Sequence, residues 1–302
     1  MRSRRFLAAL IVLCAALAGF LVWRRTHPDY DAAHLLQTLP LNRAVKVYID
    51  AGALRSAGLL DLVAGSRAAE EADYRRFVEQ TGFDYRTDLD AIAAAFVDGS
   101  GYFAVRGRFH WNRLSDYARA QQGSCANSVC SMPATRPDRV ISFYPLAGDV
   151  LALAVTGNAR SALDISPASG KPPVVAPSAP VWISAPGAAF RDLNGLPSGS
   201  RVLSPLADSQ EAVFSIRAAG QDRFEVRMDA TYPAAEGAQK AAQQLIATTN
   251  LLRSMLARDK LTPNPADLSG PLTAGKFEVQ ASHVIGTWPF EKQFFQALLT
   301  AN

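Results

Sequence analysis

Histidine is the side chain that most often serves as a general base near neutral pH, and four histidines occur in this chain of 302 residues. None belongs to an H-E-x-x-H pattern, so zinc chemistry of the metalloprotease type lacks its ligands. His110 and His283 are the candidate bases for a hydrolase whose site no motif marks. His283 shares the apolar side of an alternating segment with Phe277 and Val279, a position more typical of a partly buried structural histidine.

A pair of cysteines, Cys125 and Cys130, lies in the segment G-S-C-A-N-S-V-C-S-M. Their spacing differs from the C-x-x-C of redox enzymes, and a metal site would need further ligands, of which only His110 lies nearby in the sequence. In an oxidising compartment the pair is expected to form a disulfide. Because the closed loop is short, this disulfide would stabilise the fold by only about 2 kcal/mol and would hold a surface loop in place.

Three other segments match functional motifs only in part. The sequence G-L-P-S-G at 195–199 resembles a nucleophile elbow, but its serine is out of register with G-x-S-x-G. The S-G-K at 169–171 lacks the upstream glycine of a phosphate-binding loop and is followed by prolines. Asp84, Asp88 and Asp90 lack the glycine and the distal glutamate of a calcium loop, and their spacing favours helix capping instead. The sequence therefore predicts no cofactor and no metal site.

An uncharged apolar segment occupies residues 6–23 and has arginines at both ends. As a helix it would be about 27 Å long, close to the thickness of the hydrocarbon core of a bilayer. The excess of positive charge before it favours a cytoplasmic N-terminus, which places the remaining chain outside the cytoplasm. We therefore expect residues 1–25 to be a signal anchor or signal peptide of a single-pass inner-membrane protein, with its C-terminal domain periplasmic or extracellular.

Whether this segment is cleaved depends on Ala16-Leu17-Ala18, which fits the small-x-small pattern of signal peptidase. The apolar run continues past that site to Trp23, which favours an uncleaved anchor. Both alternatives place the folded domain outside the cytoplasm.

The basic pI of about 9.0 also originates in this N-terminal segment. Five arginines flank it, and without them 26 basic side chains stand against 27 acidic ones in the chain. Nucleic-acid binding requires clustered Lys and Arg that displace counterions from phosphates, and no such cluster remains. Nucleic acid is therefore excluded as a partner.

The elements that must position these side chains form an α+β pattern with mainly antiparallel sheets. Alternating or continuous apolar segments predict strands at 45–50, 102–109, 140–144, 150–155, 181–184 and 276–282, and a hairpin at 212–232 with its turn at 220–222. Helical spacing predicts helices over 68–96 with a break at 81–84, over 111–121, over 234–258 and from about 289 to the C-terminus. The strand at 150–155 is apolar on both faces, which indicates a central position in its sheet.

Proline density divides the folded part. A tether at 26–40 leads into a first α+β half at 41–165, a proline-rich linker follows at 166–180, and 181–302 form a second α+β half. Residues 47–51, V-Y-I-D-A, are similar to V-W-I-S-A at 181–185. This similarity predicts that the halves are diverged copies of one unit.

The first half also carries a resemblance to known sequences. Leu39-Pro40, the strand V-K-V-Y-I-D at 45–50, A-L-R-S at 53–56, G-L-L at 58–60 and T-G-F-D-Y-R-T-D-L-D at 81–90 are similar to membrane-anchored exported bacterial proteins of uncharacterised function. The resemblance covers about a sixth of the chain. It implies an anchored extracytoplasmic α+β domain, often duplicated, with no established activity or site to carry over.

These observations favour a non-catalytic binding or scaffolding domain of the cell envelope. Its partners would be the membrane, through residues 6–23, and an envelope protein or lipid. One alternative is an extracytoplasmic hydrolase that uses His110 or His283 as its base. Another is a lipid or lipoprotein carrier, in which the sheet and the helix at 234–258 enclose an apolar cavity.

An uncleaved anchor predicts that the mature protein keeps all 302 residues, with an intact mass of 32.4 kDa, and remains in the membrane fraction. Mass spectrometry of that fraction measures the intact mass directly. A mature chain that begins after residue 18 would demonstrate cleavage and contradict the uncleaved anchor.

Overall fold

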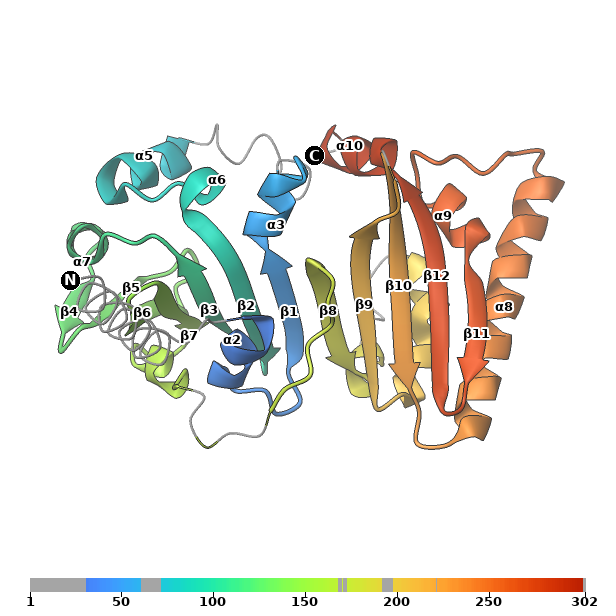
Figure 1. Cartoon of the computed structure of the whole chain (residues 1–302), viewed down its shortest axis with the longest axis horizontal. Helices are drawn as coiled ribbons and strands as arrows, with labels where there is room; N and C mark the ends of the chain where they lie inside the picture. The colour runs from blue at the N-terminus through green and yellow to red at the C-terminus, as the bar shows by residue number, and fades with distance from the viewer. Residues whose placement is uncertain are drawn as a thin grey trace, which may run out of the picture.

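The computed structural model describes residues 31–60, 72–167, 170, 173–191, 198–220 and 222–300. Within these ranges twelve strands form one antiparallel sheet in the order β11-β12-β10-β9-β8-β1-β2-β3-β7-β6-β5-β4 (Figure 1). The prediction of an α+β fold with antiparallel pairing is confirmed. The two halves contribute their strands to this single sheet.

The strands are β1 Val45–Asp50, β2 Leu89–Val97, β3 Ser100–Gly107, β4 Ser124–Ala126, β5 Val129–Pro133, β6 Val140–Ala147, β7 Val150–Thr156, β8 Val181–Pro186, β9 Glu211–Ala218, β10 Arg223–Thr231, β11 Lys276–Gln280 and β12 His283–Glu291. The helices are α2 Ala32–Thr38, α3 Ala51–Ser56, α5 Ala72–Thr81, α6 Tyr85–Asp88, α7 Trp111–Ala120, α8 Ala235–Arg258, α9 Ser269–Ala274 and α10 Lys292–Thr300, with 3-10 turns η2 Ser161–Asp164, η3 Gly187–Phe190 and η5 Ser198–Asp208.

In the first half, α2 packs on one face of the sheet, which we call the α2 face (Figure 1). Leu35 and Leu36 of this helix are completely buried against a surface of alanines that includes Ala93, Ala104 and Ala152. Because alanine extends so little from the strand, the helix backbone approaches the sheet closely. The opposite face packs against α7 through Leu151 and its neighbours.

In the second half, α8 covers the face opposite α2. Met228, Val284 and Trp288 point toward this helix and pack in one core with its Ala241 and Leu245. Strand alternation places the polar residues of β9 and β10 on the α2 face. The predicted hairpin is present as β9 and β10, and its residue pairing gives it one buried and one more solvated face.

The two halves meet where β1 pairs with β8. From this junction outward the strand order is β1-β2-β3-β7-β6 in the first half and β8-β9-β10-β12-β11 in the second, so both halves have the same connectivity. Tyr48 and Trp182, which are equivalent in the similarity between 47–51 and 181–185, face each other in the register. Their rings stack with centroids 5.8 Å apart and planes inclined by 24°.

Two sequence predictions are wrong in this region. Residues 89–96 were expected to be helical but belong to β2, because the alanines of this strand are buried between α2 and the neighbouring strands, and packing outweighs helix propensity. The expected tether at 26–40 contains α2, whose Leu35 and Leu36 belong to the core. The described residues of 166–180 form no helix or strand.

Cys125 and Cys130 lie opposite each other in the short hairpin of β4 and β5 and form a disulfide, with Cα atoms 4.0 Å apart. This agrees with the predicted pairing. Asn127 and Ser128 form the turn between them, both with positive φ, which is typical of a two-residue hairpin turn. The predicted loop is therefore an ordered hairpin at the edge of the sheet.

No helix among the described residues is both long and apolar enough to span a bilayer. The predicted anchor at 1–25 lies outside the described residues, and so do 195–197 of the elbow-like segment, Ser169 and Lys171 of the S-G-K segment, and Gln221 of the hairpin turn.

Replacing Leu35 with alanine should lower the free energy of unfolding by about 2–5 kcal/mol, because it opens a cavity between α2 and the alanines of the sheet. Leu163→Ala, at a side chain that is 51% exposed, is the matched control and should change stability by less than about 1 kcal/mol. Urea unfolding followed by circular dichroism measures both. Equal effects of the two substitutions would mean that α2 does not pack as described.

Candidate functional site

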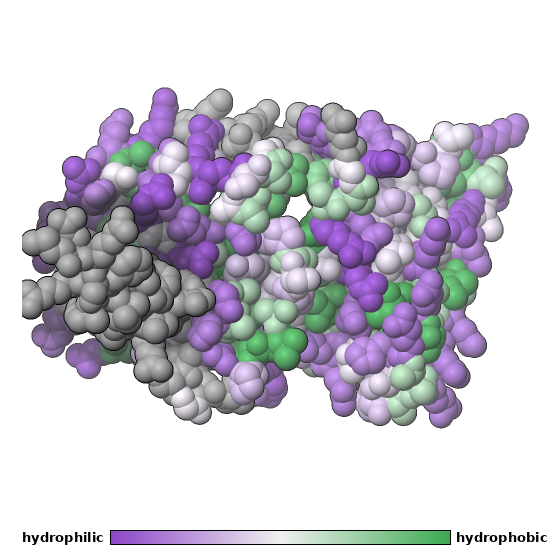
Figure 2. All heavy atoms as spheres, in the orientation of Figure 1, coloured by the Kyte–Doolittle hydropathy of each residue, from purple (hydrophilic) through white to green (hydrophobic). Residues whose placement is uncertain are grey.

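A cavity of about 560 Å³ lies on the α2 face beside the junction of the two halves. Its walls come from α2, from the linker at 174–177 and from strands β1, β8, β9, β10 and β12. Figure 2 shows hydrophilic side chains mixed with hydrophobic ones over these central strands. We call this cavity the junction pocket.

The sheet register arranges the pocket residues in three cross-strand rows. Residues that face each other across antiparallel strands point to the same side of the sheet, so each row presents its side chains to the cavity together. The rows are Trp182-Ser215-Arg227, then Lys46-Ser184-Val213-Asp229, and finally Glu211-Thr231-His283.

An ion pair connects the two halves in this pocket. Lys46 Nζ of β1 donates to Glu211 Oε1 of β9 at 2.5 Å, and the Ser184 hydroxyl donates to the same oxygen. Burial alone would raise the pKa of the Glu211 carboxyl, but the hydrogen bonds from Lys46 and Ser184 outweigh burial and lower this pKa. Glu211 is therefore held as a carboxylate with its charge compensated.

His283 and Asp229 form a second polar pair. The Nδ1 atom of His283 lies 2.8 Å from Asp229 Oδ1 and 3.3 Å from Thr231 Oγ1, and the two paired side chains are 43% and 40% exposed. Since Nδ1 contacts Asp229 and Thr231, Nε2 is the ring nitrogen that can bind a ligand or accept a proton. Of the two candidate bases, His283 thus has a carboxylate partner and lies in a pocket.

The sequence placed His283 on the apolar side of the strand at 276–282, and this is wrong. The chain turns at Ala281, which has a φ of 54°, and His283 begins the next strand, β12, opposite Gln280. Its side chain shares the polar side with Thr231 and Asp229. A positive φ at alanine is uncommon, so the sequence contained little signal for this turn.

Arg227 is the cation of this pocket that has no hydrogen bond or ion pair within the described part of the chain. The carboxylates two positions away on the same strand face, Glu225 and Asp229, are each bonded to another residue. Glu225 accepts from Arg217, whose Nε lies 3.0 Å from Oε1, and Asp229 is bonded to His283. The guanidinium donors of Arg227 are therefore available. In the sequence, Arg227 is one of several charged residues on the polar side of a predicted strand. Nothing in the sequence shows that the neighbouring carboxylates are bonded to other side chains.

The indole of Trp182 forms part of the wall of the junction pocket and is 2% exposed. Its Nε1 is buried and finds no acceptor among the described residues. Burying an N–H group without an acceptor costs free energy.

His110, the other candidate base, precedes α7 and does not line the junction pocket. It is exposed, and it makes no side-chain hydrogen bond at the helix N-terminus. The structure therefore gives it no partner among the described residues for a role as a base.

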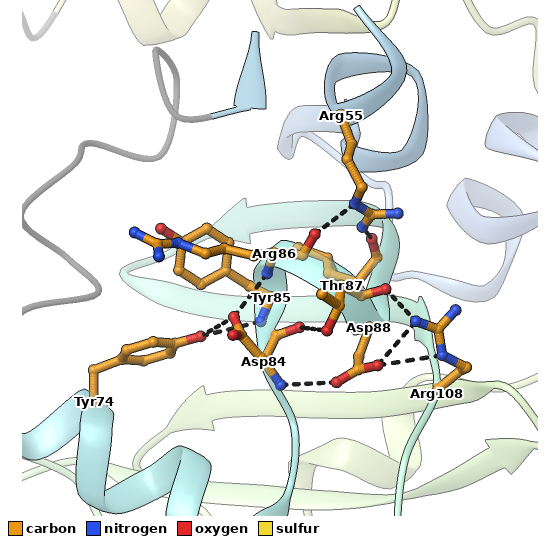
Figure 3. Close-up of polar contacts among 9 residues, drawn as sticks. Arg55, Tyr74, Asp84, Tyr85, Arg86, Thr87, Asp88 and Arg108 are labelled. Carbon is orange, nitrogen blue, oxygen red and sulfur yellow. Dashed lines mark hydrogen bonds and ion pairs between the residues drawn. The ribbon is translucent and has the colours of Figure 1, made fainter. Parts of the chain in front are cut away.

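Of the three aspartates, Asp84 and Asp88 belong to a structural network (Figure 3). The Asp84 carboxylate accepts the backbone N–H of Arg86 at 2.9 Å and the hydroxyl of Tyr74 at 2.9 Å, which caps α6 and fixes it to α5. Asp88 accepts the backbone N–H of Asp84 and pairs with Arg108 at 2.9 Å. The capping interpretation is confirmed for Asp84.

Charges in this network are already compensated. Burial alone would raise the pKa of Asp88, but the hydrogen bonds from Asp84 and Arg108 outweigh it and lower the pKa. Burial, together with the nearby Asp84 charge, raises the pKa of Tyr74 to about 12. Within the described ranges, no group of three or more His, Cys, Asp and Glu side chains is arranged to hold a metal ion.

Glu211→Gln should lower the free energy of unfolding at pH 7, because the lowered pKa of the wild-type carboxylate stabilises the folded state above its ordinary pKa of 4.5. This advantage is lost as the pH falls below about 4.5 and the carboxylate is protonated, so the two proteins should converge there. Urea unfolding between pH 3 and 7 measures the difference. Glu278→Gln, at an exposed position of β11, is the control, and a pH-independent difference for Glu211→Gln would contradict the assigned ion pair.

No protein-family model and no curated protein matches the chain. Among solved structures, crystal form III of TP0453 superimposes with a TM-score of 0.52 at 11% sequence identity, covering 88% of this chain and 97% of that one. Crystal forms IV and I of TP0453 give TM-scores of 0.46 and 0.44 at 10% and 9% identity, each covering 90% of this chain and 98% and 99% of those chains. At this level of identity the similarity to form III concerns the fold alone.

Proposed function

We propose that the chain is a membrane-anchored extracytoplasmic protein of the cell envelope, whose folded part binds a ligand in the junction pocket. In this proposal residues 1–25 anchor the protein in the inner membrane. The remaining residues lie in the periplasm or outside the cell, where the disulfide of Cys125 and Cys130 can form.

The observation that carries the binding role is the composition of the junction pocket. It combines apolar surfaces from α2, the linker and Trp182 with charged groups held in defined positions by neighbouring strands. Binding sites for small molecules have this combination, in which apolar walls supply contact and a few polar groups fix orientation. Its volume of about 560 Å³ falls in the range of such sites.

A binding role is favoured over catalysis because, among the described residues, no hydroxyl of the pocket is hydrogen-bonded to Nε2 of His283. Ser215 lies in the row of Arg227, and the other two hydroxyls have different partners. Ser184 is hydrogen-bonded to Glu211, and the Thr231 hydroxyl lies near Nδ1 of His283, the nitrogen that also contacts Asp229. A nucleophile activated by this histidine would have to be bonded to Nε2.

A hydrolase is the second candidate function, and the His283–Asp229 pair favours it. Asp229 orients the imidazole, and Nε2 would remove a proton from a water molecule that attacks the substrate. Hydrolysis of a generic ester that is lost in His283→Gln and reduced in Asp229→Asn would support this candidate. Activity that survives His283→Gln would eliminate it.

A lipid or lipoprotein carrier is less well supported. A carrier for acyl chains needs a continuous apolar cavity, whereas the junction pocket contains Lys46, Glu211, Arg227 and Asp229. Burying these charges under an acyl chain would be costly. A ligand with its own polar groups suits the pocket better.

We also propose that the two halves are diverged copies of one unit. Their common strand order and the facing positions of Tyr48 and Trp182 support a common origin. An alignment of many homologues of each half should match Tyr48 with Trp182, and a consistent match at another position would contradict the duplication.

Val213→Trp should prevent ligand binding by filling the pocket with an indole where a small side chain now lies between Ser184 and Asp229. The full-length protein is incubated with a small-molecule extract of the cell envelope and then examined by native mass spectrometry. We expect the wild type to retain a bound mass that Val213→Trp loses.

The matched control is Glu278→Trp, which adds the same bulk to an exposed position of β11 away from this pocket, and it should retain the ligand. If Val213→Trp and wild type retained the same masses, or if the wild type retained none, the junction pocket would not be the binding site.

A further inference from the structure

We propose that the junction pocket recognises a small organic anion, a carboxylate or a phosphate ester, whose oxygen atoms accept hydrogen bonds from Arg227 and Ser215. This inference rests on the proposed binding function and specifies the chemical class of the ligand.

Among the charged groups of the pocket, Arg227 is the one whose hydrogen-bond donors have no partner within the described residues. Each carboxylate near it is bonded to a different side chain: Glu211 to Lys46, Asp229 to His283, and Glu225 to Arg217. A guanidinium has five N–H donors in a planar fork that matches carboxylate and phosphate oxygens. Within the described residues, the nearby carboxylates are bonded to other side chains. The N–H groups of Arg227 can therefore donate hydrogen bonds to oxygen atoms of a ligand.

Ser215 supplies a second donor at the same place. It faces Arg227 across the β9–β10 pairing, lines the cavity, and its hydroxyl has no hydrogen bond within the described ranges. Facing side chains in an antiparallel pair have Cβ atoms about 5 Å apart, so one ligand oxyanion can contact both groups.

On the other side of Ser215 in the same row lies Trp182, beside the apolar linker residues Val174 and Pro177. The uncharged part of the ligand would lie against this wall. An acceptor on the ligand that reached Trp182 Nε1 would also satisfy a buried donor that the described residues leave unpaired. The ligand is therefore an anion with an uncharged organic body, and inorganic phosphate alone fits the pocket less well.

Asp229 limits how much negative charge the site accepts. It lies two positions from Arg227 on the same face of β10, and it lines the same pocket. A second negative charge on the ligand would be repelled by this carboxylate. Singly charged groups, such as carboxylates and phosphodiesters, should therefore bind more tightly than a doubly charged phosphate.

Isothermal titration calorimetry on the full-length protein in nanodiscs tests this assignment with butyrate, dimethyl phosphate, inorganic phosphate, n-butanol and n-butylamine as probes. We expect saturable binding of butyrate and dimethyl phosphate, weaker binding of inorganic phosphate, and no saturable binding of the alcohol or the amine. Butyrate binding that exceeds that of dimethyl phosphate would identify a carboxylate as the natural group, and the reverse order a phosphodiester.

The decisive variant is Arg227→Gln, which should weaken oxyanion binding about tenfold or more, the equivalent of about 1.4 kcal/mol. Arg223→Gln is the matched control, because it removes the same charge from an exposed position of the same strand outside the pocket, and it should bind like wild type. Arg227→Lys keeps the charge but loses the fork, so it should fold normally and bind with intermediate affinity.

Equal affinities of wild type and Arg227→Gln would overturn the inference, as would a wild type that binds neither oxyanion or binds butanol as tightly as butyrate. These results differ from failure of the proposed function. If Val213→Trp abolished retention of the envelope ligand while Arg227→Gln had no effect, the pocket would be a binding site for a ligand that is not an anion.

Discussion

The pairing of β1 with β8 is the interaction on which the rest of the structure depends. Within the described residues, this pairing alone joins the five strands of the second half to the seven strands of the first in one sheet, and Tyr48 stacks on Trp182 at its centre. The pairing of β1 with β8 supplies main-chain hydrogen bonds. The stacked rings and the Lys46–Glu211 ion pair fix the register of the two strands. A register shift by one residue would turn all these side chains to the other face and dismantle the junction pocket.

The position of the pocket follows from an asymmetry between the halves. Both halves bury their α8-side face under helices, but among the described residues a helix packs on the α2 face in the first half alone, against its alanine strands. The second half carries Ser215, Arg227 and Asp229 on that face, which would not pack against an apolar helix. Where the helix-covered surface ends and the polar surface begins, α2 and the linker form one wall and the charged strands form the other.

Much of this fold could be predicted from the sequence, because strict alternation identified β1, β9 and β10 and helical spacing identified α7 and α8. β2 was missed because its alanines favour a helix in isolation, and only burial between α2 and adjacent strands makes them a strand. Most of the residues that form the junction pocket could not be identified from the sequence. His283 was a candidate from the sequence, but it was predicted on the wrong face of its strand. Its partner Asp229 is 54 positions away along the chain. That separation is closed by the β10–β12 pairing, which local patterns do not encode.

The central claim, that the β1–β8 junction builds a ligand-binding pocket, is tested most directly by fixing the junction covalently. Val47 and Ile183 face each other in the β1–β8 register and point away from the pocket, so Val47→Cys with Ile183→Cys should form a disulfide on oxidation. Native mass spectrometry of the oxidised full-length double variant then reports the crosslink and the bound ligand together. We expect an intramolecular crosslink with the envelope ligand retained as in wild type. Failure to crosslink, or a crosslinked protein that no longer retains the ligand, would contradict it.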